Sequence, residues 1–257
     1  MDNYKLDKFN FESLKNIDSN ITICINGASK SGKNHWANEA IYWLNKSKKH
    51  GNFKNVFLFS ATAEIQNSFP QVPKNNRFVN LNLLNNIIEI RKKTGNIKDN
   101  ILIILDDFAT MKCGGKMVKN CDVLGGITYF RHLGISCVLL THRDTQLAPI
   151  MRNSCAIVVN FLPKTKQDQK SIKDRYLSIG SSKLQIEKIY HQVFSEQYSA
   201  LVCLQYKNGT NISDYCTISV APENLRKYKL NIKKIKNNKN NNKNNNNKIK
   251  YLYRLDV

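Results

Sequence analysis

A glycine-rich stretch near the amino terminus has the spacing of a loop that binds phosphate groups. It reads INGASKSGKNHW over residues 25–36, and the pattern that it matches is G-x-x-x-x-G-K-[ST]. Gly27, Gly32 and Lys33 occupy three of the four fixed positions, and Asn34 stands where a serine or threonine is usual. An apolar run precedes the loop and a helix-like segment follows it, which is the context that this motif requires.

Each part of this loop has a defined role in binding a nucleoside triphosphate. The backbone N–H groups and the positive end of the following helix would hold the β-phosphate, and Lys33 would bridge the β- and γ-phosphates. The usual hydroxyl binds Mg²⁺, and the side-chain carbonyl oxygen of Asn34 is an acceptable ligand for the same ion. The residues expected to contact ATP are Gly27, Ala28, Ser29, Lys30, Ser31, Gly32, Lys33, Asn34 and His35.

Two adjacent carboxylates end a second apolar run, ILIILDDF (101–108). Acids at a strand end beside a phosphate-binding loop hold Mg²⁺, directly or through water, and activate the attacking water. We expect Asp106 to bind the metal and Asp107 to act as the general base. The alternative is that both side chains only cap the strand or the turn after it. Because the loop and the acids agree in order, spacing and context, together they predict a P-loop NTPase that binds ATP and Mg²⁺.

A third apolar run, ISCVLLTH (135–142), ends in the polar residues Thr141 and His142. In one large branch of the P-loop ATPases, a polar residue at this place detects the γ-phosphate and orients water. His142 is the candidate for this sensor, and the alternative is a surface residue at a strand end. Gln146 lies four residues farther on and is a subsidiary candidate for the same role.

Short β-branched apolar runs alternate with longer amphipathic segments along the chain. The runs lie at 21–26, 55–60, 101–107, 135–142 and 155–161. Their nearly continuous apolar character is typical of strands buried on both faces of a parallel sheet. Helix-like segments lie at about 34–49, 82–94, 120–133 and 145–153. This order predicts an α/β fold with a mostly parallel central sheet and helices on both faces.

The segments after residue 161 predict further elements at the end of the domain. Helical patterns lie near 166–179 and 182–195, and 199–206 and 214–221 read as a closing pair of strands. The chain divides into an N-terminal extension (1–19), an ATPase domain (20–222) and a basic tail rich in Asn and Lys (223–257). The tail carries 11 basic and 2 acidic residues, and its low complexity predicts that it is largely disordered. It is either an arm that holds DNA or a passive product of an A/T-rich genome.

The composition indicates a basic globular protein. Of 257 residues, 41% are hydrophobic, and the formal net charge is +21, which favours nucleic acid as a partner over an acidic membrane surface. The seven cysteines form no C-x-x-C pair, so we expect free thiols in a reducing compartment and no zinc site. The amino terminus has no apolar core and no run approaches about 20 apolar residues, so we expect an intracellular protein with neither a secretory signal nor a membrane span.

The stretch YFRHLGISCVLLTHRDTQLAPIMRNSCAIVVNF (129–161) carries features beyond the nucleotide-binding motifs. The paired or single residues that stand out are Arg131-His132, Ile135-Ser136, Thr141-His142, Pro149, Arg152-Asn153 and Phe161. With the loop and the acids, they resemble the genome-packaging ATPases of poxviruses, other large DNA viruses and virophages, a branch of the FtsK–HerA superfamily of RecA-like P-loop ATPases. The resemblance spans about residues 20–162. Two positions depart from the family, because Asn34 replaces Ser/Thr and His142 replaces a sensor Gln.

The resemblance implies a ring-forming motor, a pentamer or hexamer, that threads double-stranded DNA into a preformed capsid. In such a ring each nucleotide lies at a subunit boundary, where an arginine of the neighbour stabilises the transferring phosphate. Arg152 and Arg131 are the candidates, and Arg152 is the one that we expect to complete the neighbour's site. A salt bridge or a DNA-phosphate contact is the alternative for each. The implied partners are double-stranded DNA, further copies of the chain and proteins of the capsid vertex. The implied location is the host cytoplasm, a viral factory or the virion.

The sequence therefore predicts an ATP-driven DNA translocase that packages a viral genome. The lysine-flanked glycines of MKCGGKMVKN (111–120) predict either a loop near the pore that touches DNA or an ordinary surface turn. A helicase or conjugation-type translocase is the alternative within the same class. A catalytically weak or silent nucleotide- or DNA-binding assembly subunit is the alternative from another class, and Asn34 favours it.

Overall fold

The apolar runs of the sequence all become strands of one sheet in the computed structural model of the protein. The structure describes residues 6–62, 67–95, 99–108, 111–113, 116–117, 122–178, 181–207, 209–230 and 232. The strands of the sheet are β1 (Thr22–Asn26), β2 (Asn55–Ser60), β3 (Arg77–Phe78), β4 (Ile101–Asp106), β7 (Ile135–Thr141), β8 (Ile157–Phe161), β9 (Ser199–Leu204) and β10 (Cys216–Val220). A separate ribbon pairs β5 (Lys112–Cys113) with β6 (Lys116–Met117), within the stretch expected to form a DNA-touching loop or a turn.

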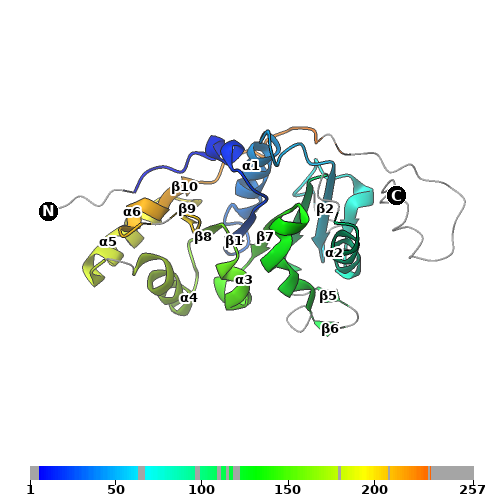
Figure 1. Ribbon diagram of the computed structural model, residues 1–257. Helices are drawn as coiled ribbons and strands as arrows, with labels where there is room; N and C mark the ends of the chain where they lie inside the picture. The colour runs from blue at the N-terminus through cyan, green and yellow to red at the C-terminus, as the bar shows by residue number, and fades with distance from the viewer. Residues whose placement is uncertain are drawn as a thin grey trace, which may run out of the picture.

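The strand order places the carboxyl ends of the central strands side by side. The order is β10-β9-β8-β1-β7-β4-β2-β3, and the strands from β8 to β3 run parallel. The last pair is antiparallel: β9 runs against β8, and β10 runs against β9. Asn26 at the end of β1 is level with Thr141 on one side and Asn160 on the other. The loop after β1 therefore lies at the same edge of the sheet as the ends of β4 and β7 (Figure 1).

The helices differ in type from the sequence expectation in two places. The α-helices are α1 (Lys33–Asn45), α2 (Asn82–Thr94), α3 (Pro149–Asn153), α4 (Lys166–Ile172), α5 (Lys183–Val193) and α6 (Ile212–Tyr215). The segment expected as a helix at 120–133 is a 3₁₀ helix, η5 (Asp122–Leu133). The one expected at 145–153 is split into a 3₁₀ turn, η6 (Asp144–Gln146), and α3. Pro149 occupies the first turn of α3, where its missing N–H costs nothing, and η7 (Lys173–Leu177) continues α4 as a π-helical turn.

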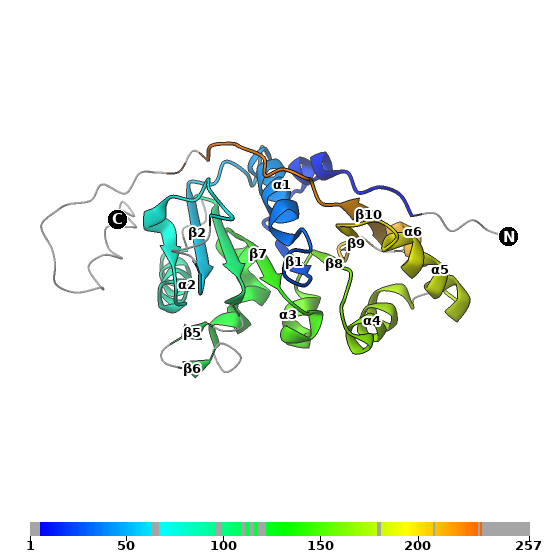
Figure 2. The same ribbon diagram turned by 180° about the vertical axis from the view of Figure 1, so that it is seen from behind.

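Hydrophobic layers cover both faces of the sheet, as the sequence predicts. In β1, Ile23 and Ile25 pack in the layer that contains α1, whereas Cys24 packs in the opposite layer. The second layer holds buried residues of α2, η5, α3, η7, α5 and α6. Alternation of side chains along each strand sends one set to each layer, and Figures 1 and 2 show the two sets of helices on opposite sides. The expected mostly parallel α/β architecture is therefore confirmed.

Both ends of the described chain pack on α1. The short 3₁₀ helix η1 (Phe11–Asn16) lies against it, and the rings of Phe9 and Phe11 lie 5.6 and 5.0 Å from that of Trp36. At the other end, residues 221–230, which we call the strap, run from β10 along α1 and are drawn in orange in Figure 2. Tyr228, Leu230 and Ile232 pack against the same hydrophobic layer. The folded body therefore continues past residue 222, where the sequence predicts a disordered tail to begin, and residues 233–257 of that tail lie outside the described residues.

Five cysteines in the described region are buried free thiols: Cys24, Cys137, Cys155, Cys203 and Cys216. Burial raises the pKa of the Cys24, Cys137 and Cys203 thiols well above the ordinary value, which keeps them protonated and unreactive. Among the described helices, none is both long and apolar enough to cross a membrane.

Candidate nucleotide-binding site

Two glycines of the loop between β1 and α1 occupy positions where a larger residue would be strained or too close to its neighbours. Gly32 has a φ of 101°, in the left-handed region, and a Cβ there would lie 2.7 Å from the Cβ of Ala221. A Cβ on Gly27 would lie 2.8 Å from the Cβ of Phe161. α1 begins directly after the loop, at Lys33. The free N–H groups of its first turn and the positive end of its dipole therefore face the loop, as anion binding requires.

The Lys33 side chain is folded back onto the loop. Only 6% of the residue is exposed, and Nζ donates hydrogen bonds to the backbone carbonyls of Gly27 and Ala28, the latter at 3.1 Å. Burial lowers the pKa of this ammonium group, and the negative charges of Asp107 and Asp106 oppose that shift. Lys33 is thus a buried cation whose partners are weak neutral acceptors. Phosphate oxygens, which carry charge, are stronger partners for the same group.

The two acids at the end of β4 lie in different environments. Asp106 is 3% exposed, and its pKa is raised to about 6, chiefly by burial and then by the charge of Asp107, against the opposing effect of Lys33. Asp107 has a left-handed φ of 50°, and its backbone N–H donates to the carbonyl of Leu140 at 3.2 Å. This turn directs the chain away from the strand just after Asp106. The two carboxylates therefore differ in burial although they are adjacent in sequence.

The raised pKa of Asp106 predicts a stability cost that depends on pH. The ordinary pKa is 3.8 and the folded value is about 6, so between these values the unfolded chain releases the proton while the folded chain holds it. The cost of folding grows with pH through this window and is complete above it, at about 3 kcal/mol. We expect Asp106→Asn to raise the free energy of unfolding by about 1–3 kcal/mol at pH 8 and by almost nothing at pH 4.

Urea unfolding of the wild type and Asp106→Asn at the two pH values checks this prediction. Asp174→Asn, at an exposed position of η7, is the matched control and should show no such difference. An equal effect of Asp106→Asn at pH 4 and pH 8 would contradict the assignment of a raised pKa to this carboxyl. We expect Asp106→Asn to be more stable than the wild type in the absence of ligands and to lose turnover. This combination is expected of a residue that is retained for binding and not for stability.

The side chain of His142 contacts that of Asp107. Its Nε2 is 3.0 Å from Oδ1 of Asp107, and about 40% of its side chain is exposed. Thr141, the preceding residue, is buried and donates from Oγ1 to Oδ1 of Asn26 at 2.5 Å. Asn26 in turn donates to Oδ1 of Asn160 at 2.8 Å. These side-chain hydrogen bonds link the ends of β7, β1 and β8. They therefore fix the end of β7, which His142 directly follows.

The remaining candidates from the sequence lie outside this cluster. Oε1 of Gln146 accepts from the backbone N–H groups of His142 at 3.0 Å and Arg143 at 3.2 Å, so its amide holds the turn after β7. Arg152 is half-buried, and its Nη1 donates to the carbonyls of Leu147 and Asp144. Arg131 is exposed and lines a second cavity, at the amino-terminal edge of β1 and β8. The structure does not bring either arginine to the nucleotide site of its own chain.

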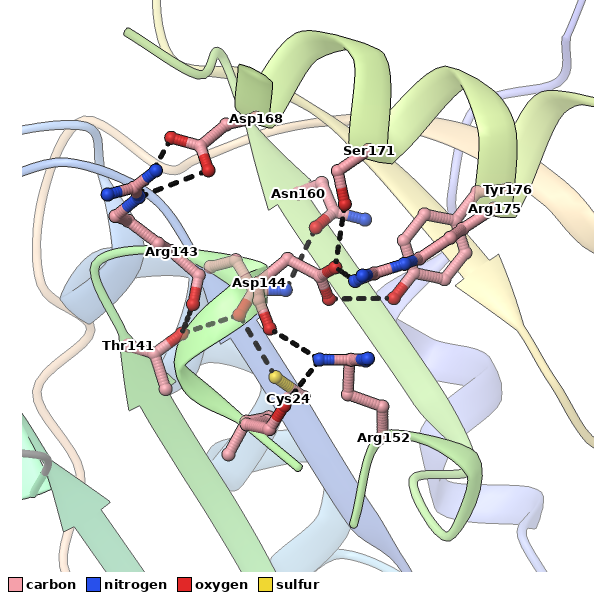
Figure 3. A network of polar contacts seen from close by, with 12 residues as sticks. Cys24, Thr141, Arg143, Asp144, Arg152, Asn160, Asp168, Ser171, Arg175 and Tyr176 are labelled. Carbon is pink, nitrogen blue, oxygen red and sulfur yellow. Dashed lines mark hydrogen bonds and ion pairs between the residues drawn. The ribbon is translucent and has the colours of Figure 1, made fainter. Parts of the chain in front are cut away.

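Asp144 is the centre of a buried polar network that fixes the turn after His142 (Figure 3). The residue is 3% exposed. Its carboxylate accepts from Tyr176 Oη at 2.9 Å, from Ser171 Oγ at 3.4 Å and from Nη1 of Arg175. These partners come from α4 and η7. The network therefore joins the loop that carries His142 to the α4–η7 segment.

Removing the Asp144 carboxylate is expected to destabilise the fold. Asp144→Ala should lower the free energy of unfolding by about 2–4 kcal/mol, because the buried Tyr176 hydroxyl and the Arg175 guanidinium lose their partner. Asp174→Ala, an exposed acid on the same π-helical turn, should change it by less than about 0.5 kcal/mol. Chemical denaturation of both variants measures the difference. Equal losses for the two variants would show that the network contributes nothing to stability.

One cavity of about 750 Å³ contains the loop, the acids and His142. Every expected nucleotide contact from Ala28 to His35 lines it, as do Asp106, Asp107 and His142. Gly27 lies at the start of the loop, where its carbonyl accepts from Lys33. Mg²⁺ commonly takes one or two protein oxygen ligands and completes its shell with phosphate oxygens and water. Asn34 and Asp106 supply two such oxygens at the same cavity, so the residues present fit this ion.

The sequence reasoning missed the wall of the cavity opposite the acids. Tyr198 and residues 221, 222, 223 and 225 line it there. Ring-nitrogen Nδ1 of His35 lies 2.8 Å from the carbonyl oxygen of Pro222, which attaches the strap to the first turn of α1. None of these residues belongs to a motif, and they reach the loop only because β9 and β10 extend the sheet. A regular alternation at Tyr228, Leu230 and Ile232 is the one local signal that this segment packs on the body.

Neither a family model nor a curated protein sequence matches the chain, but solved structures share its fold. The genome-packaging NTPase B204 from Sulfolobus turreted icosahedral virus 2, solved with ATP-γS, has a TM-score of 0.52 at 16% identity, over 79% of this chain and 97% of that one. The DNA-packaging ATPase B204 from Sulfolobus turreted icosahedral virus gives 0.50 at 17% identity, over 79% and 98%. EssC (ATPases 2 and 3) from Geobacillus thermodenitrificans gives 0.50 at 14% identity, over 82% of this chain and 41% of that one.

At these identities the likeness concerns the fold. The match extends over 79% of this chain and over almost the full length of B204. The fold expected from the phosphate-binding loop and the strand-end acids is therefore confirmed by comparison with proteins that have it. This chain has the P-loop NTPase fold that a viral genome-packaging NTPase and EssC share.

Proposed function

We propose that this protein is an ATPase that drives double-stranded DNA into a viral capsid. The single observation that carries the proposal is the meeting of Lys33, Asp106, Asp107 and His142 around one cavity at the phosphate-binding loop. A buried lysine, a buried acid and an acid paired with a histidine are the groups that phosphoryl transfer to water needs. The fold shared with a protein described as a DNA-packaging ATPase supports the choice of class.

Binding of ATP uses groups that the loop already presents. The triphosphate enters the loop, and the Lys33 ammonium group leaves the carbonyls of Gly27 and Ala28 for the β- and γ-phosphate oxygens. Asn34 and Asp106 would hold Mg²⁺, which neutralises phosphate charge when it is bound. The free N–H groups at the start of α1 complete the cradle. For Lys33 this exchange replaces two neutral acceptors with charged ones.

Asp107 is the general base of the proposed hydrolysis. A water molecule between this carboxylate and the γ-phosphorus gives its proton to Asp107 while its oxygen bonds to phosphorus. The bond from phosphorus to the β–γ bridging oxygen breaks, and ADP and inorganic phosphate are the products. His142, with Nε2 at 3.0 Å from Oδ1 of Asp107, orients this carboxylate and detects the γ-phosphate from the same position. The proposal thus gives His142 the sensor role that a Gln has in the family it resembles.

A ring of five or six copies is the proposed working form. In it, an arginine of one copy stabilises the transferring phosphate of the next. Arg131 is the better placed of the two candidates, because its side chain is exposed, whereas Arg152 is half-buried and donates to two carbonyls of its own chain. A site completed by its neighbour explains why no arginine of the described chain lines the cavity.

The proposed partners are double-stranded DNA and proteins of the capsid vertex. The proposed location is the infected host cell or the virion. The formal net charge of +21 suits a polyanionic partner held without regard to sequence. DNA affinity should therefore fall steeply as salt rises, as it does whenever phosphates are neutralised by Lys and Arg.

Displacement of a third strand from a triplex on linear duplex DNA tests translocation directly. The proposal expects displacement with Mg²⁺-ATP and none with a non-hydrolysable analogue. ATP turnover without any displacement, and unchanged by DNA, would reject the translocase and leave an ATPase. A forked duplex as substrate separates a packaging motor from a helicase, because a helicase would also separate its two strands.

Asn34 supports a second candidate, a nucleotide-binding assembly subunit with weak or no turnover. Its side chain is longer than that of a serine, so Asn34 would hold Mg²⁺ through an amide oxygen instead of the usual hydroxyl. ATP binding that depends on Lys33, with no turnover at any protein concentration, would favour this candidate over the motor.

A further inference from the structure

The cavity at the phosphate-binding loop extends well beyond the groups that handle phosphate. Asp106 and Asp107 lie at the end of β4, two strands from β1, on one side of the loop. On the other side lie Tyr198 and the strap, where β9 begins and β10 ends. A triphosphate in the loop, with its γ-phosphate towards the acids, directs its sugar and base away from them. The strap side is therefore where the rest of a nucleotide must lie.

The strap is held on α1 by a built set of contacts. Nε and Nη2 of Arg226 each donate to Glu39 at 2.6 Å, and the Glu39 side chain is only 8% exposed. The guanidinium group of Arg226 also lies 4.4 Å from the ring centre of Tyr42. Asn38 donates from Nδ2 to the carbonyl of Arg226 at 3.0 Å. Because a buried carboxylate and an aromatic face both hold this arginine, the strap has a fixed place on the helix that follows the loop.

The antiparallel pair β9–β10 brings Tyr198 to the same wall. Ala221, the first residue of the strap, donates its N–H to the carbonyl of Tyr198 at 3.0 Å. Tyr198 has a left-handed φ of 63° and 45% of it is exposed. A Cβ placed on Gly32 would lie 3.6 Å from the Cβ of Tyr198. The aromatic ring is thus anchored by its backbone beside the last glycine of the loop, with a large part of its surface open at the cavity.

We infer that Tyr198 and the strap form the subsite that binds a purine base, so that the two antiparallel strands and the C-terminal segment select the nucleotide. The inference rests on the proposed function and names the substrate class as purine nucleoside triphosphates. An exposed aromatic ring beside apolar Pro222 and Leu225, both half-buried at the cavity wall, offers the flat apolar surface on which a base stacks. A purine covers more of such a surface than a pyrimidine does.

Binding of ATP compared with inorganic tripolyphosphate, both with Mg²⁺, tests the subsite separately from the phosphate cradle. Tripolyphosphate has no base or sugar, so it reports on the loop alone. Tyr198→Ala keeps the Cβ beside Gly32 and removes the ring, and Arg226→Ala releases the strap. We expect each to weaken ATP binding about threefold to tenfold and to leave tripolyphosphate binding within about twofold of the wild type. Their preference for ATP and GTP over CTP and UTP should fall together with ATP affinity.

Two variants serve as matched controls. Tyr206→Ala removes an exposed tyrosine, 52% exposed, that lines the cavity at the opposite edge of the sheet. Lys227→Ala removes the exposed positive charge next to Arg226. Both should bind ATP as the wild type does. Thermal unfolding identifies a variant that is poorly folded, and Tyr198→Ala, which leaves the strap's ion pair intact, tests the inference if Arg226→Ala is unstable.

The outcomes distinguish a failure of the subsite from a failure of the function. If wild type, Tyr198→Ala and Arg226→Ala bind ATP equally well, the wall does not bind the base, whereas the cradle and the proposed function stand. Loss of tripolyphosphate binding in step with ATP binding would overturn the inference too, because it would place the effect in the loop. If the wild-type protein binds neither ligand, the proposed function itself is wrong.

Discussion

Replacing Lys33 with alanine is expected to weaken the binding of Mg²⁺-ATP about a hundredfold and to reduce turnover to background. Among the described residues, Lys33 is the one buried cation at the loop. When ATP binds, phosphate oxygens would replace the carbonyls of Gly27 and Ala28 as its hydrogen-bond acceptors. Two charge-assisted hydrogen bonds to phosphate contribute roughly 3 kcal/mol or more, which corresponds to that loss of affinity. Isothermal titration with ATP and a turnover assay measure the two effects.

Lys48→Ala is the control for this prediction. Lys48 is an exposed lysine just past the end of α1, and its removal should change neither affinity nor turnover. ATP binding by Lys33→Ala within about threefold of the wild type would contradict the placement of the phosphates in this loop. Unchanged thermal stability of Lys33→Ala, or a slight gain, is expected because a buried charge is removed.

Asp107→Asn should separate catalysis from binding. We expect turnover to fall about a thousandfold, since a general base typically contributes between a hundredfold and ten-thousandfold. ATP affinity should stay within about threefold of the wild type, because an amide keeps the size of the side chain and its hydrogen-bonding ability towards His142. Steady-state turnover and equilibrium ATP binding, measured on the same preparation, check both halves of this prediction.

Asp174→Asn, an exposed acid on η7, is the control for Asp107→Asn. A parallel loss of binding and turnover in Asp107→Asn would assign this carboxylate to the metal or the phosphates instead of to the attacking water. An Asp107→Asn variant as active as the wild type would show that Asp107 is not the general base.

The parts of the fold that the sequence predicts are those set by local pattern. The apolar runs that became β1, β2, β4, β7 and β8 are buried on both faces, so their continuous apolar character is enough to identify them. The phosphate-binding loop is predicted by its glycines, because the left-handed φ of Gly32 and the tight contact at Gly27 leave no room for another residue. Asp106 and Asp107 are predicted as site residues because they stand at the end of an apolar run.

The parts that the sequence does not predict depend on contacts between distant segments. The segment at 122–133 has the apolar spacing of a helix, and its 3₁₀ form is set by packing against β7 and α2. The strap lies in a stretch whose average composition indicates disorder, and it is ordered by Arg226 on Glu39 and by Tyr228 on the α1 layer. The pairing of Tyr198 with Ala221 across the β9–β10 hairpin leaves no trace in either segment alone.

The structure also shows the surroundings of the residues that differ from the pattern of the packaging ATPases that the sequence resembles. His142 stands where a Gln is usual, and its ring nitrogen lies within hydrogen-bonding distance of Asp107, a contact that strand order predicts only when β4 and β7 are neighbours. Gln146, which could have replaced the missing amide, instead holds the turn after β7. The effect of Asn34 depends on the position of a Mg²⁺ ion, which sequence pattern does not fix.

Turnover of Mg²⁺-ATP by the wild-type chain, with and without duplex DNA and over a range of protein concentrations, decides whether the chain is a DNA-driven ATPase. We expect turnover above that of Lys33→Ala, stimulation by duplex DNA, and a rate that rises more than in proportion to protein concentration, because each site needs a neighbour. A rate equal to that of Lys33→Ala at every concentration, with or without DNA, would contradict this expectation.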